Sequence, residues 1–372
     1  MSPSLRFPEF TGEWKEERLS EIADIYKGAG ISKDQLSDNG EPCILYGELY
    51  TKYKTETITE VISRTDIDNT KLVRSKANDV IIPCSGETAE DIATARCVIK
   101  DGILLGGDLN IIRLHNYDGS FVSYQLNGKR KYDIAKVAQG VSVVHLYGEH
   151  LKGVKTVNPC LAEQKKISRF LSLLDERIAV QNRLIDRLQS LMKGIRHRII
   201  NEAKGKIVCL CEVSDIYQPQ TISSADLTET GYPVYGANGI IGHYTSYNHE
   251  AEQVCITCRG NTCGGVNYTK SKSWITGNAM VVNVDRYQNI VSKRYLYHYL
   301  SNCDFNSIIS GSGQPQIVRA PLAKFKIILP TVMQQYKIAH CLDVIQNKIN
   351  VNSNILNLLI RQKQYLLRKM FI

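Results

Sequence analysis

Residues 159–203 read PCLAEQKKISRFLSLLDERIAVQNRLIDRLQSLMKGIRHRIINEA, and apolar side chains recur through this stretch at alternating spacings of four and three. The recurring residues are Ile167, Leu171, Leu174, Ile178, Ile185, Leu188, Met192, Ile195 and Ile199. This spacing predicts a long α-helix with an apolar seam of the coiled-coil type, interrupted once at Gln181. Asn158 with Pro159 is a typical helix entry, and Lys204 with Gly205 a typical end.

A second stretch, residues 331–372, has the same pattern. Its seam residues are Ile338, Leu342, Ile345, Ile349, Leu356, Leu359, Lys363, Leu366 and Met370, with a gap at Asn352. The first helix ends where a globular segment begins and the second starts where that segment ends, so an antiparallel pair is predicted. In matched register Gln181 would face Asn352, and one such polar layer fixes helix register. About 37 helical residues would give a spacer of roughly 55 Å.

The rest of the chain is an internal repeat. Leu19-Ser-Glu-Ile-Ala-Asp-Ile-Tyr26 recurs as Leu210-Cys-Glu-Val-Ser-Asp-Ile-Tyr217, and Pro83-Cys-Ser-Gly-Glu-Thr88 is matched by Thr257-Cys-Arg-Gly-Asn-Thr262. At an offset of 171, Leu151 to Pro159 match Leu322 to Pro330, and Glu163-Gln-Lys-Lys-Ile167 matches Gln334-Gln-Tyr-Lys-Ile338. A duplicated unit therefore supplies a domain and a helix twice. The predicted segments are 1–158 (domain), 159–203 (helix), 204–330 (domain) and 331–372 (helix).

Both globular segments contain short apolar runs broken by glycine and asparagine, which predict β-strands with loops between them. The clearest runs are Val80 to Pro83, Ile103 to Leu114, Val254 to Cys258 and Ala279 to Val284. Ser292 to Leu300 has a helical pattern instead. We therefore expect an α+β fold in which two homologous domains are separated by two long antiparallel coiled-coil helices, with pseudo-twofold symmetry.

Composition narrows the functional classes. The chain has 372 residues and a net charge of +9. The two helical segments carry 15 basic and 6 acidic side chains, whereas residues 1–158 carry 20 basic and 23 acidic ones. Basic helices suit a nucleic-acid partner, although a solvated helix face has the same composition.

Eleven scattered cysteines indicate free thiols, and neither a signal peptide nor a membrane helix is visible, so a cytoplasmic protein is expected.

Three further segments carry a resemblance to a known family. They are Phe7-Pro-Glu-Phe-Thr-Gly-Glu-Trp14, the loop Gly311-Ser-Gly-Gln-Pro-Gln316, and Pro330 followed by Gln334-Gln335. Together with the duplication and the helices, they make the whole chain resemble the specificity subunit of type I restriction-modification systems. That resemblance implies two target recognition domains that read a bipartite double-stranded DNA sequence. It also implies docking of two modification (methyltransferase) subunits and possible restriction subunits, with S-adenosylmethionine and ATP/Mg bound by those partners.

The chain departs from its own repeat at one loop. The first copy has Gly140-Val-Ser-Val-Val-His145 where the second has Gly311 to Gln316, so no shared chemical role is expected for the two loops.

Sequence motifs for catalysis are weak. Neither a phosphate-binding G-x-x-x-x-G-K-[ST] loop nor a G-x-G-x-x-G fingerprint occurs, and Asn158-Pro159-Cys160 lacks the second proline and the aromatic of an amino-methyltransferase motif. The cysteines that come closest to a zinc site are Cys255, Cys258 and Cys263, with His249 or Cys303 as a fourth ligand. Packing of small thiols in strands is the simpler interpretation, and no catalytic base is placed beside a cysteine. We predict a non-catalytic protein without a cofactor or metal of its own.

Two other functions remain open from the sequence: a DNA methyltransferase with its own recognition domains, and a coiled-coil adaptor for protein partners. For the DNA-binding function, bases are read by Arg, Lys, Asn and Gln from loops where glycine allows close approach. The predicted DNA-binding residues of the first domain are Tyr46, Tyr50, Lys52, Tyr53, Lys54, Ser85, Glu87, Lys129, Arg130 and Lys131. Those of the second are Tyr235, Asn238, His243, Tyr244, Arg259, Asn261, Asn278, Gln314 and Gln316.

Overall fold

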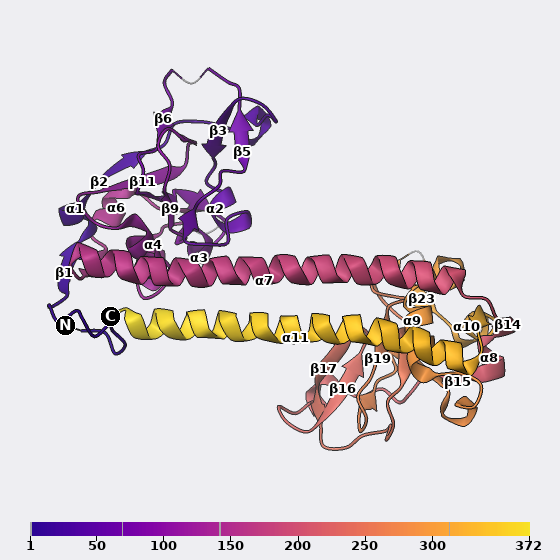
Figure 1. The fold of residues 1–372 in the computed structure, drawn as a ribbon. Helices are drawn as coiled ribbons and strands as arrows, with labels where there is room; N and C mark the ends of the chain where they lie inside the picture. Colours follow the sequence, from indigo (N-terminus) through magenta and orange to yellow (C-terminus); the bar gives the residue numbers. More distant parts are fainter. Residues whose placement is uncertain (1, 69, 141–142, 312) are drawn as a thin grey trace. The chain divides into compact units, whose positions relative to one another are not determined.

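The computed structural model describes residues 2–68, 70–140, 143–311 and 313–372, and the chain divides into two compact units. Unit 1 comprises residues 1–182 and 354–372, and unit 2 comprises residues 183–353. Each unit contains one globular domain and a segment of each of two long helices, α7 (Leu161–Glu202) and α11 (Val332–Met370) (Figure 1). The predicted α+β class and the two long helices are confirmed.

The apolar seam predicted from the sequence is buried in both units. In unit 1 its buried members are Ile167, Leu171, Leu174, Leu359, Leu366 and Met370. In unit 2 Met192, Leu342 and Ile349 are buried, with Leu188, Ile195, Ile338 and Ile345 packed against them. Within each unit the two helical segments run in opposite directions, as predicted (Figure 1). Each fully buried Leu or Ile contributes about 1.5–3 kcal/mol, so the seam stabilises the helices far more than helix propensity does.

The start of α7 differs from the prediction. The Cys160 carbonyl accepts hydrogen bonds from the Glu163 amide (3.0 Å) and the Gln164 amide (3.1 Å), so the helix begins at Leu161. Asn158 does not cap it, because this residue ends a β-strand and its side-chain amide donates to Glu17 (3.0 Å). A helix-entry pattern in the sequence was therefore a strand end.

The domain of unit 1 has two main sheets. Its strands are β1 (Lys15–Arg18), β2 (Ala23–Lys27), β3 (Glu41–Ile44), β4 (Thr57–Ile58), β5 (Ser63–Thr65), β6 (Val73–Arg74), β7 (Asp79–Pro83), β8 (Ser85–Gly86), β9 (Arg96–Val98), β10 (Leu104–Leu105), β11 (Leu109–Leu114), β12 (Val144–His145) and β13 (Lys155–Asn158). Its short helices are α1 (Leu19–Ile22), α2 (Glu48–Thr51), α3 (Ala89–Ile92), α4 (Gly119–Asn127), α5 (Lys131–Val137) and α6 (Gly148–Lys152). The sheet orders are β2-β11-β7-β9-β4 and β5-β3-β10-β6.

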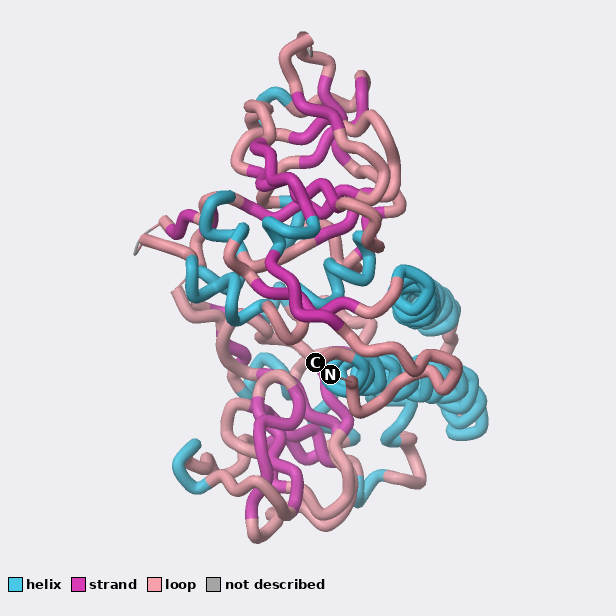
Figure 2. The backbone as a smooth tube through the Cα atoms, turned by 90° about the vertical axis from the view of Figure 1, so that its left-hand side faces the viewer, coloured by secondary structure: helices cyan, strands magenta, loops and turns pink. Residues whose placement is uncertain are grey.

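The domain of unit 2 repeats this topology with fewer strands. Its strands are β14 (Lys206–Cys209), β15 (Asp215–Tyr217), β16 (Tyr232–Gly236), β17 (Gly239–Tyr244), β18 (Val254–Thr257), β19 (Val266–Tyr268), β20 (Trp274–Ile275), β21 (Ala279–Asn283), β22 (Ile309–Ser310), β23 (Gln316–Ile317) and β24 (Lys326–Leu329). Its short helices are α8 (Leu210–Val213), α9 (Lys293–Leu300) and α10 (Arg319–Ala323). The sheet orders β15-β21-β18-β19 and β17-β16-β20 match those of unit 1, and Figure 2 shows the strands of both units in magenta.

The central strands β7 and β18 are equivalent in the two copies. Both are buried over their whole length, β7 from Asp79 to Pro83 and β18 from Val254 to Thr257. A strand buried on both faces reads as a continuous apolar run, which is how both appear in the sequence. Because each is held between antiparallel neighbours, the loop that leaves its carboxyl end has a fixed position.

Candidate nucleic-acid interface

In unit 2 the chain leaves β18 at Thr257 and enters a turn in which Gly260 has a φ of +86°. Two neighbouring segments are hydrogen-bonded to this turn. The Cys258 amide donates to the Asn278 carbonyl (3.0 Å), and the Gly260 amide donates to the Pro315 carbonyl (3.0 Å). These bonds bring residues 258–261, 276–278 and 313–316 together, and we call this surface the unit 2 loop edge.

The unit 2 loop edge carries five of the predicted residues, all exposed: Arg259, Asn261, Asn278, Gln314 and Gln316. Arg259 and Gln316 lie directly opposite one another in an antiparallel bridge. Directly opposed residues project to the same face of a sheet, and their side chains are cross-strand neighbours. Within the described ranges Arg259 forms no ion pair, so its guanidinium is available. Arg pairs bidentately with guanine and Gln with adenine.

The hairpin of β16 and β17 adjoins the same edge. The Thr257 hydroxyl donates to the Ala237 carbonyl, which places exposed Asn238 beside the unit 2 loop edge. His243 and Tyr244 lie half-buried on β17.

Tyr235 lies in the core instead. Its ring is 6% exposed, its hydroxyl accepts a hydrogen bond from the Lys270 amide (3.1 Å), and burial raises its pKa. This side chain is used by the fold and does not reach the loop edge.

Unit 1 builds the same surface with the same backbone hydrogen bonds. The Cys84 amide donates to the Asp108 carbonyl (2.6 Å), and the Leu146 amide donates to the Cys84 carbonyl (2.7 Å), just as the Ile317 amide donates to the Cys258 carbonyl (3.0 Å). We call residues 84–87, 106–108 and 143–147 the unit 1 loop edge.

Two predicted residues lie on the unit 1 loop edge: Ser85, which is 8% exposed, and Glu87, which is exposed. Ser85 pairs with His145 across β8 and β12 in the way that Arg259 pairs with Gln316. His145 therefore occupies the backbone position of Gln316, although their loops differ in sequence. Val141, Ser142 and Ser312 of these loops lie outside the described residues.

A cavity of about 1150 Å³ opens beside the unit 1 loop edge. Tyr46 and Lys52 line it together with Gly107 and Asp108 of that edge. The Lys52 ammonium contacts Glu48 (2.6 Å) and donates to Ser63 (2.9 Å), so this predicted side chain is already held in place. Tyr50 is half-buried in the neighbouring α2, and Lys54 is exposed.

Four predicted residues of unit 1 lie elsewhere. Tyr53 is 6% exposed, its hydroxyl accepts a hydrogen bond from the Ile62 amide (3.3 Å), and burial raises its pKa to about 12. Lys129 and Arg130 belong to the turn between α4 and α5, and Lys131 is the first residue of α5. Lys129 lines a groove with Gln364, Leu367 and Arg368 of α11. This basic turn lies beside the long helix and not on the loop edge.

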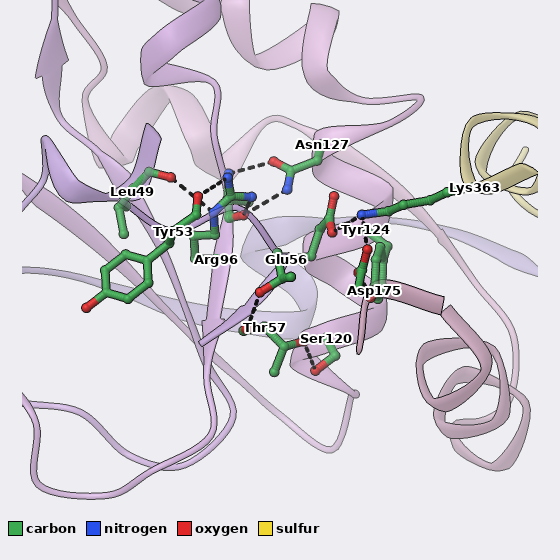
Figure 3. Close-up of polar contacts among 12 residues, drawn as sticks. Leu49, Tyr53, Glu56, Thr57, Arg96, Ser120, Tyr124, Asn127, Asp175 and Lys363 are labelled. Carbon is green, nitrogen blue, oxygen red and sulfur yellow. Dashed lines mark hydrogen bonds and ion pairs between the residues drawn. The ribbon is translucent and has the colours of Figure 1, made fainter. Parts of the chain in front are cut away.

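A buried polar cluster fixes α2 and the segment that follows it (Figure 3). The Arg96 guanidinium, on β9, donates to the Leu49 carbonyl (3.1 Å) and to the Tyr53 carbonyl (3.0 Å). Burial lowers the pKa of Arg96, although nearby carboxylates oppose the shift. No sequence pattern indicates this role of Arg96, because its partners are main-chain atoms far away along the chain.

The same cluster contains the one charged residue of the predicted seam. Lys363 of α11 contacts Glu56 (2.7 Å) and Asp175 of α7 (2.6 Å), and the Tyr124 hydroxyl of α4 donates to Asp175 (2.6 Å) (Figure 3). Burial lowers the pKa of Lys363, but the two carboxylates outweigh burial and raise it above its ordinary value. The domain of unit 1 is thus joined to its helical segments through a fully charged lysine.

Two glutamines that join domain to helix were also missed as functional candidates. Gln164 is 1% exposed, donates to the Pro159 carbonyl (2.8 Å) and accepts from the Asp118 amide (2.9 Å). Gln335 is fully buried and makes the equivalent contacts, donating to the Pro330 carbonyl (2.9 Å) and accepting from the Ser292 amide. Their repetition at an offset of 171 was the available signal.

The alternatives weighed for the cysteines find no support in the described ranges. No group of three or more His, Cys, Asp or Glu side chains there is arranged to hold a metal ion. The Cys258 thiol donates to the Gly277 carbonyl (3.6 Å), and burial raises the pKa of Cys255 to about 12.

None of the described helices is long and apolar enough to span a membrane. Gln181 belongs to unit 1 and Asn352 to unit 2, so their matched register stays a prediction.

Comparison with known proteins gives consistent matches. The model of the type I restriction modification DNA specificity domain matches twice, at residues 11–190 and 203–361. The chain is 31% identical over 148 residues to the type I restriction enzyme EcoprrI specificity subunit of Escherichia coli, which covers 38% of this chain and 36% of that subunit. It is 22% identical over 395 residues to the MjaVIII specificity subunit of Methanocaldococcus jannaschii, covering 93% of this chain and 88% of that one.

The fold also matches a solved structure. The type I restriction-modification S subunit from M. genitalium aligns with a TM-score of 0.73 at 17% identity, covering 100% of this chain and 99% of that one. The two matches of the family model coincide with the two copies of the repeat, and the structural match extends the shared fold to the long helices.

Proposed function

Because the chain belongs to the family of type I restriction modification DNA specificity domains, we propose that it reads a bipartite DNA target, one half with each unit. The observation that carries this proposal is the pair of loop edges. The same backbone hydrogen bonds present Arg259 and Gln316 in unit 2 but Ser85 and His145 in unit 1. One scaffold with different side chains at equivalent positions suits the reading of two different half-sites.

The proposed DNA contacts fall into three groups. Arg259, Asn261, Asn278, Gln314 and Gln316 would read base edges from the unit 2 loop edge, with Asn238, His243 and Tyr244 beside them. In unit 1, Ser85 and Glu87 lie on the loop edge, with Tyr46, Tyr50, Lys52 and Lys54 around the neighbouring cavity. Lys129, Arg130 and Lys131 would contact phosphates, because contacts to the DNA backbone position a protein without reading sequence.

The long helices would dock two modification subunits, and restriction subunits could join that assembly. Support comes from apolar side chains that face solvent beside the buried seam. In unit 2, Val344 and Val351 of α11 are 55% and 56% exposed, and in unit 1 Leu358 and Tyr365 of α11 are 63% and 55% exposed. Each pair is seven residues apart, so each lies on one helix face. Exposed apolar side chains that repeat along one face of a helix favour docking of a partner at that face.

In this proposal the chain contributes recognition, and methyl transfer or cleavage belongs to the partners. S-adenosylmethionine, ATP and Mg²⁺ would be bound there, and the assembly would act on DNA in the cytoplasm.

The test is selection of preferred sites from random double-stranded DNA by the chain purified with its partner subunits. We expect two short conserved blocks separated by a gap of fixed length. Recovery of protein partners without sequence-selective DNA would favour a coiled-coil adaptor. Binding of S-adenosylmethionine by the isolated chain would favour a methyltransferase. Either result would overturn the proposal.

A further inference from the structure

We propose that His145, extended by Tyr147, is a specificity-determining residue for the half-site read by unit 1, which rests on the proposed function of DNA recognition. The Gln139 and His145 main chains exchange two hydrogen bonds (2.9 and 2.7 Å), and Ser310 and Gln316 are paired across β22 and β23 in the same way. His145 and Gln316 are thus held by equivalent antiparallel pairs, each with a residue six positions earlier in its own unit.

Side-chain direction follows from this pairing, because alternate residues of a strand project to opposite faces. In unit 1 Val144 and Leu146 are buried, whereas His145 and Tyr147 are exposed. In unit 2 Ile317 is buried, whereas Gln316 and Val318 on either side of it are exposed. The exposed face of the loop edge therefore carries His145 and Tyr147 in one copy and Gln316 and Val318 in the other.

The residues paired across the two strands, Arg259 with Gln316 and Ser85 with His145, differ in length and exposure. Arg259 is long and exposed, and it stands opposite Gln316; Ser85 is short and 8% exposed, and it stands opposite His145. Unit 1 has thus lost the long polar group on one strand. In the pair of Ser85 and His145, the exposed polar side chain is therefore His145, whose imidazole offers a ring nitrogen as donor or acceptor to a base edge.

The fold itself makes little use of this imidazole. Within the described ranges its contact is the Tyr147 ring, stacked at 6.2 Å between centroids with 26° between the planes. Tyr147 is 54% exposed, so the two rings form an open aromatic pair with a polar atom on each. Because both side chains are exposed, their polar atoms are accessible to a base edge.

The experiment uses the chain assembled with its partner subunits and selects sites from random DNA. The variants are His145→Ala and His145→Gln, with Gln316→Ala as the reciprocal change in unit 2. His115→Ala is the matched control, because His115 is also an exposed histidine of unit 1 and contacts Asp24 (2.9 Å). His115 follows the last residue of β11, whereas Asp108 of the loop edge precedes the first, so the two lie at opposite ends of this strand.

We expect His145→Ala to relax preference about tenfold or more at one base pair of the unit 1 half-site, and to leave the other half-site unchanged. His145→Gln should move the preference at that base pair toward adenine, the base that Gln recognises. Gln316→Ala should relax only the other half-site, and His115→Ala should change neither.

Three results would overturn this proposal alone. They are an unchanged unit 1 half-site in both His145 variants, an equal loss of affinity for all sequences, and loss of folding in both variants, which would assign the side chain to the fold. If the unmodified assembly selected no sequence at all, the proposed function itself would fail. Site selection with the unmodified assembly therefore distinguishes failure of the His145 proposal from failure of the proposed function.

Discussion

In both units a helix of the domain contacts a long helix through a side chain at the same position of the domain helix, but the polar groups that make the contact differ between the units. In unit 1 Tyr124 lies six residues after the cap of α4 and donates to Asp175 of α7. In unit 2 His298 lies six residues after the cap of α9 and contacts Asp343 of α11 (2.8 Å), which Arg294 also contacts. The repeat has thus kept its backbone while replacing the polar contacts that attach each domain.

The two attachments also differ in depth. The side chains of Lys363, Glu56 and Asp175 are 14%, 10% and 6% exposed, whereas those of Arg294 and Asp343 are 32% and 23% exposed. Removal of one member of a buried charge group leaves the others without compensation, and water screens this loss better at an exposed site. Unit 1 should therefore be the more sensitive of the two to loss of a charge.

The largest effect is expected for Lys363→Leu in unit 1. Leucine is apolar like the other seam residues, but it removes the ammonium that contacts Glu56 and Asp175. Loss of this ion-pair partner from two buried carboxylates costs about 3–5 kcal/mol of unfolding free energy. Denaturant unfolding of the full chain, followed by hydrogen exchange of the two units, measures the loss. Adding Glu56→Gln and Asp175→Asn to Lys363→Leu should restore most of the stability. A stable single variant would show that the lysine does not compensate these carboxylates.

A smaller, pH-dependent effect is expected in unit 2. Burial lowers the pKa of His298 to about 4, against an ordinary value of 6.5, although Asp343 opposes the shift. The unfolded chain then binds a proton that the folded unit refuses, so stability is complete above pH 6.5 and falls as the pH drops toward 4. The total loss is at most about 3 kcal/mol.

The control for this effect is His298→Gln, which removes the titrating group. Its unit 2 should be less stable at pH 7 but should show little change between pH 6.5 and 4. Hydrogen exchange, followed separately for the amides of each unit, measures the stability of unit 2 at each pH. An equally steep pH dependence in the variant would assign the titration to another group.

The smallest effect compares two residues that the repeat has kept identical. Gln164→Ala removes two hydrogen bonds at its junction, and Gln335→Ala removes the equivalent two together with a third to the Ile290 carbonyl (3.0 Å). Each change should cost about 1–3 kcal/mol. Because Gln335 makes one hydrogen bond more, Gln335→Ala should cost about 1 kcal/mol more than Gln164→Ala when thermal unfolding is compared. A loss confined to one variant would show that the two junctions work differently despite their shared geometry.

The sequence predicted what depends on periodicity. The helical seam, the repeat and the apolar runs of β7 and β18 were visible because their burial imposes a regular spacing. Contacts between distant segments were not visible. Lys363 was predicted as a seam residue, and its pairing with Glu56 spans 307 residues along the chain.

The candidate site was predictable in part for a related reason. Arg259 and Asn261 lie in a glycine-containing turn, and the structure places them on an exposed edge. Tyr53 and Tyr235 were predicted to bind DNA as well but are buried, because a tyrosine ring fits a core as well as an interface. The sequence does not indicate a role for His145 in DNA recognition, because its loop differs in sequence from that of Gln316. Backbone pairing revealed the equivalence that side-chain identity concealed.

The central claim is that each unit reads one half of the target independently. The direct test replaces residues 1–158 with the corresponding region of another specificity subunit and determines the preferred DNA sites of the assembled complex. The account predicts a new sequence in one half-site, with the other half-site and its bases unchanged. A change in both half-sites, or in neither, would contradict it.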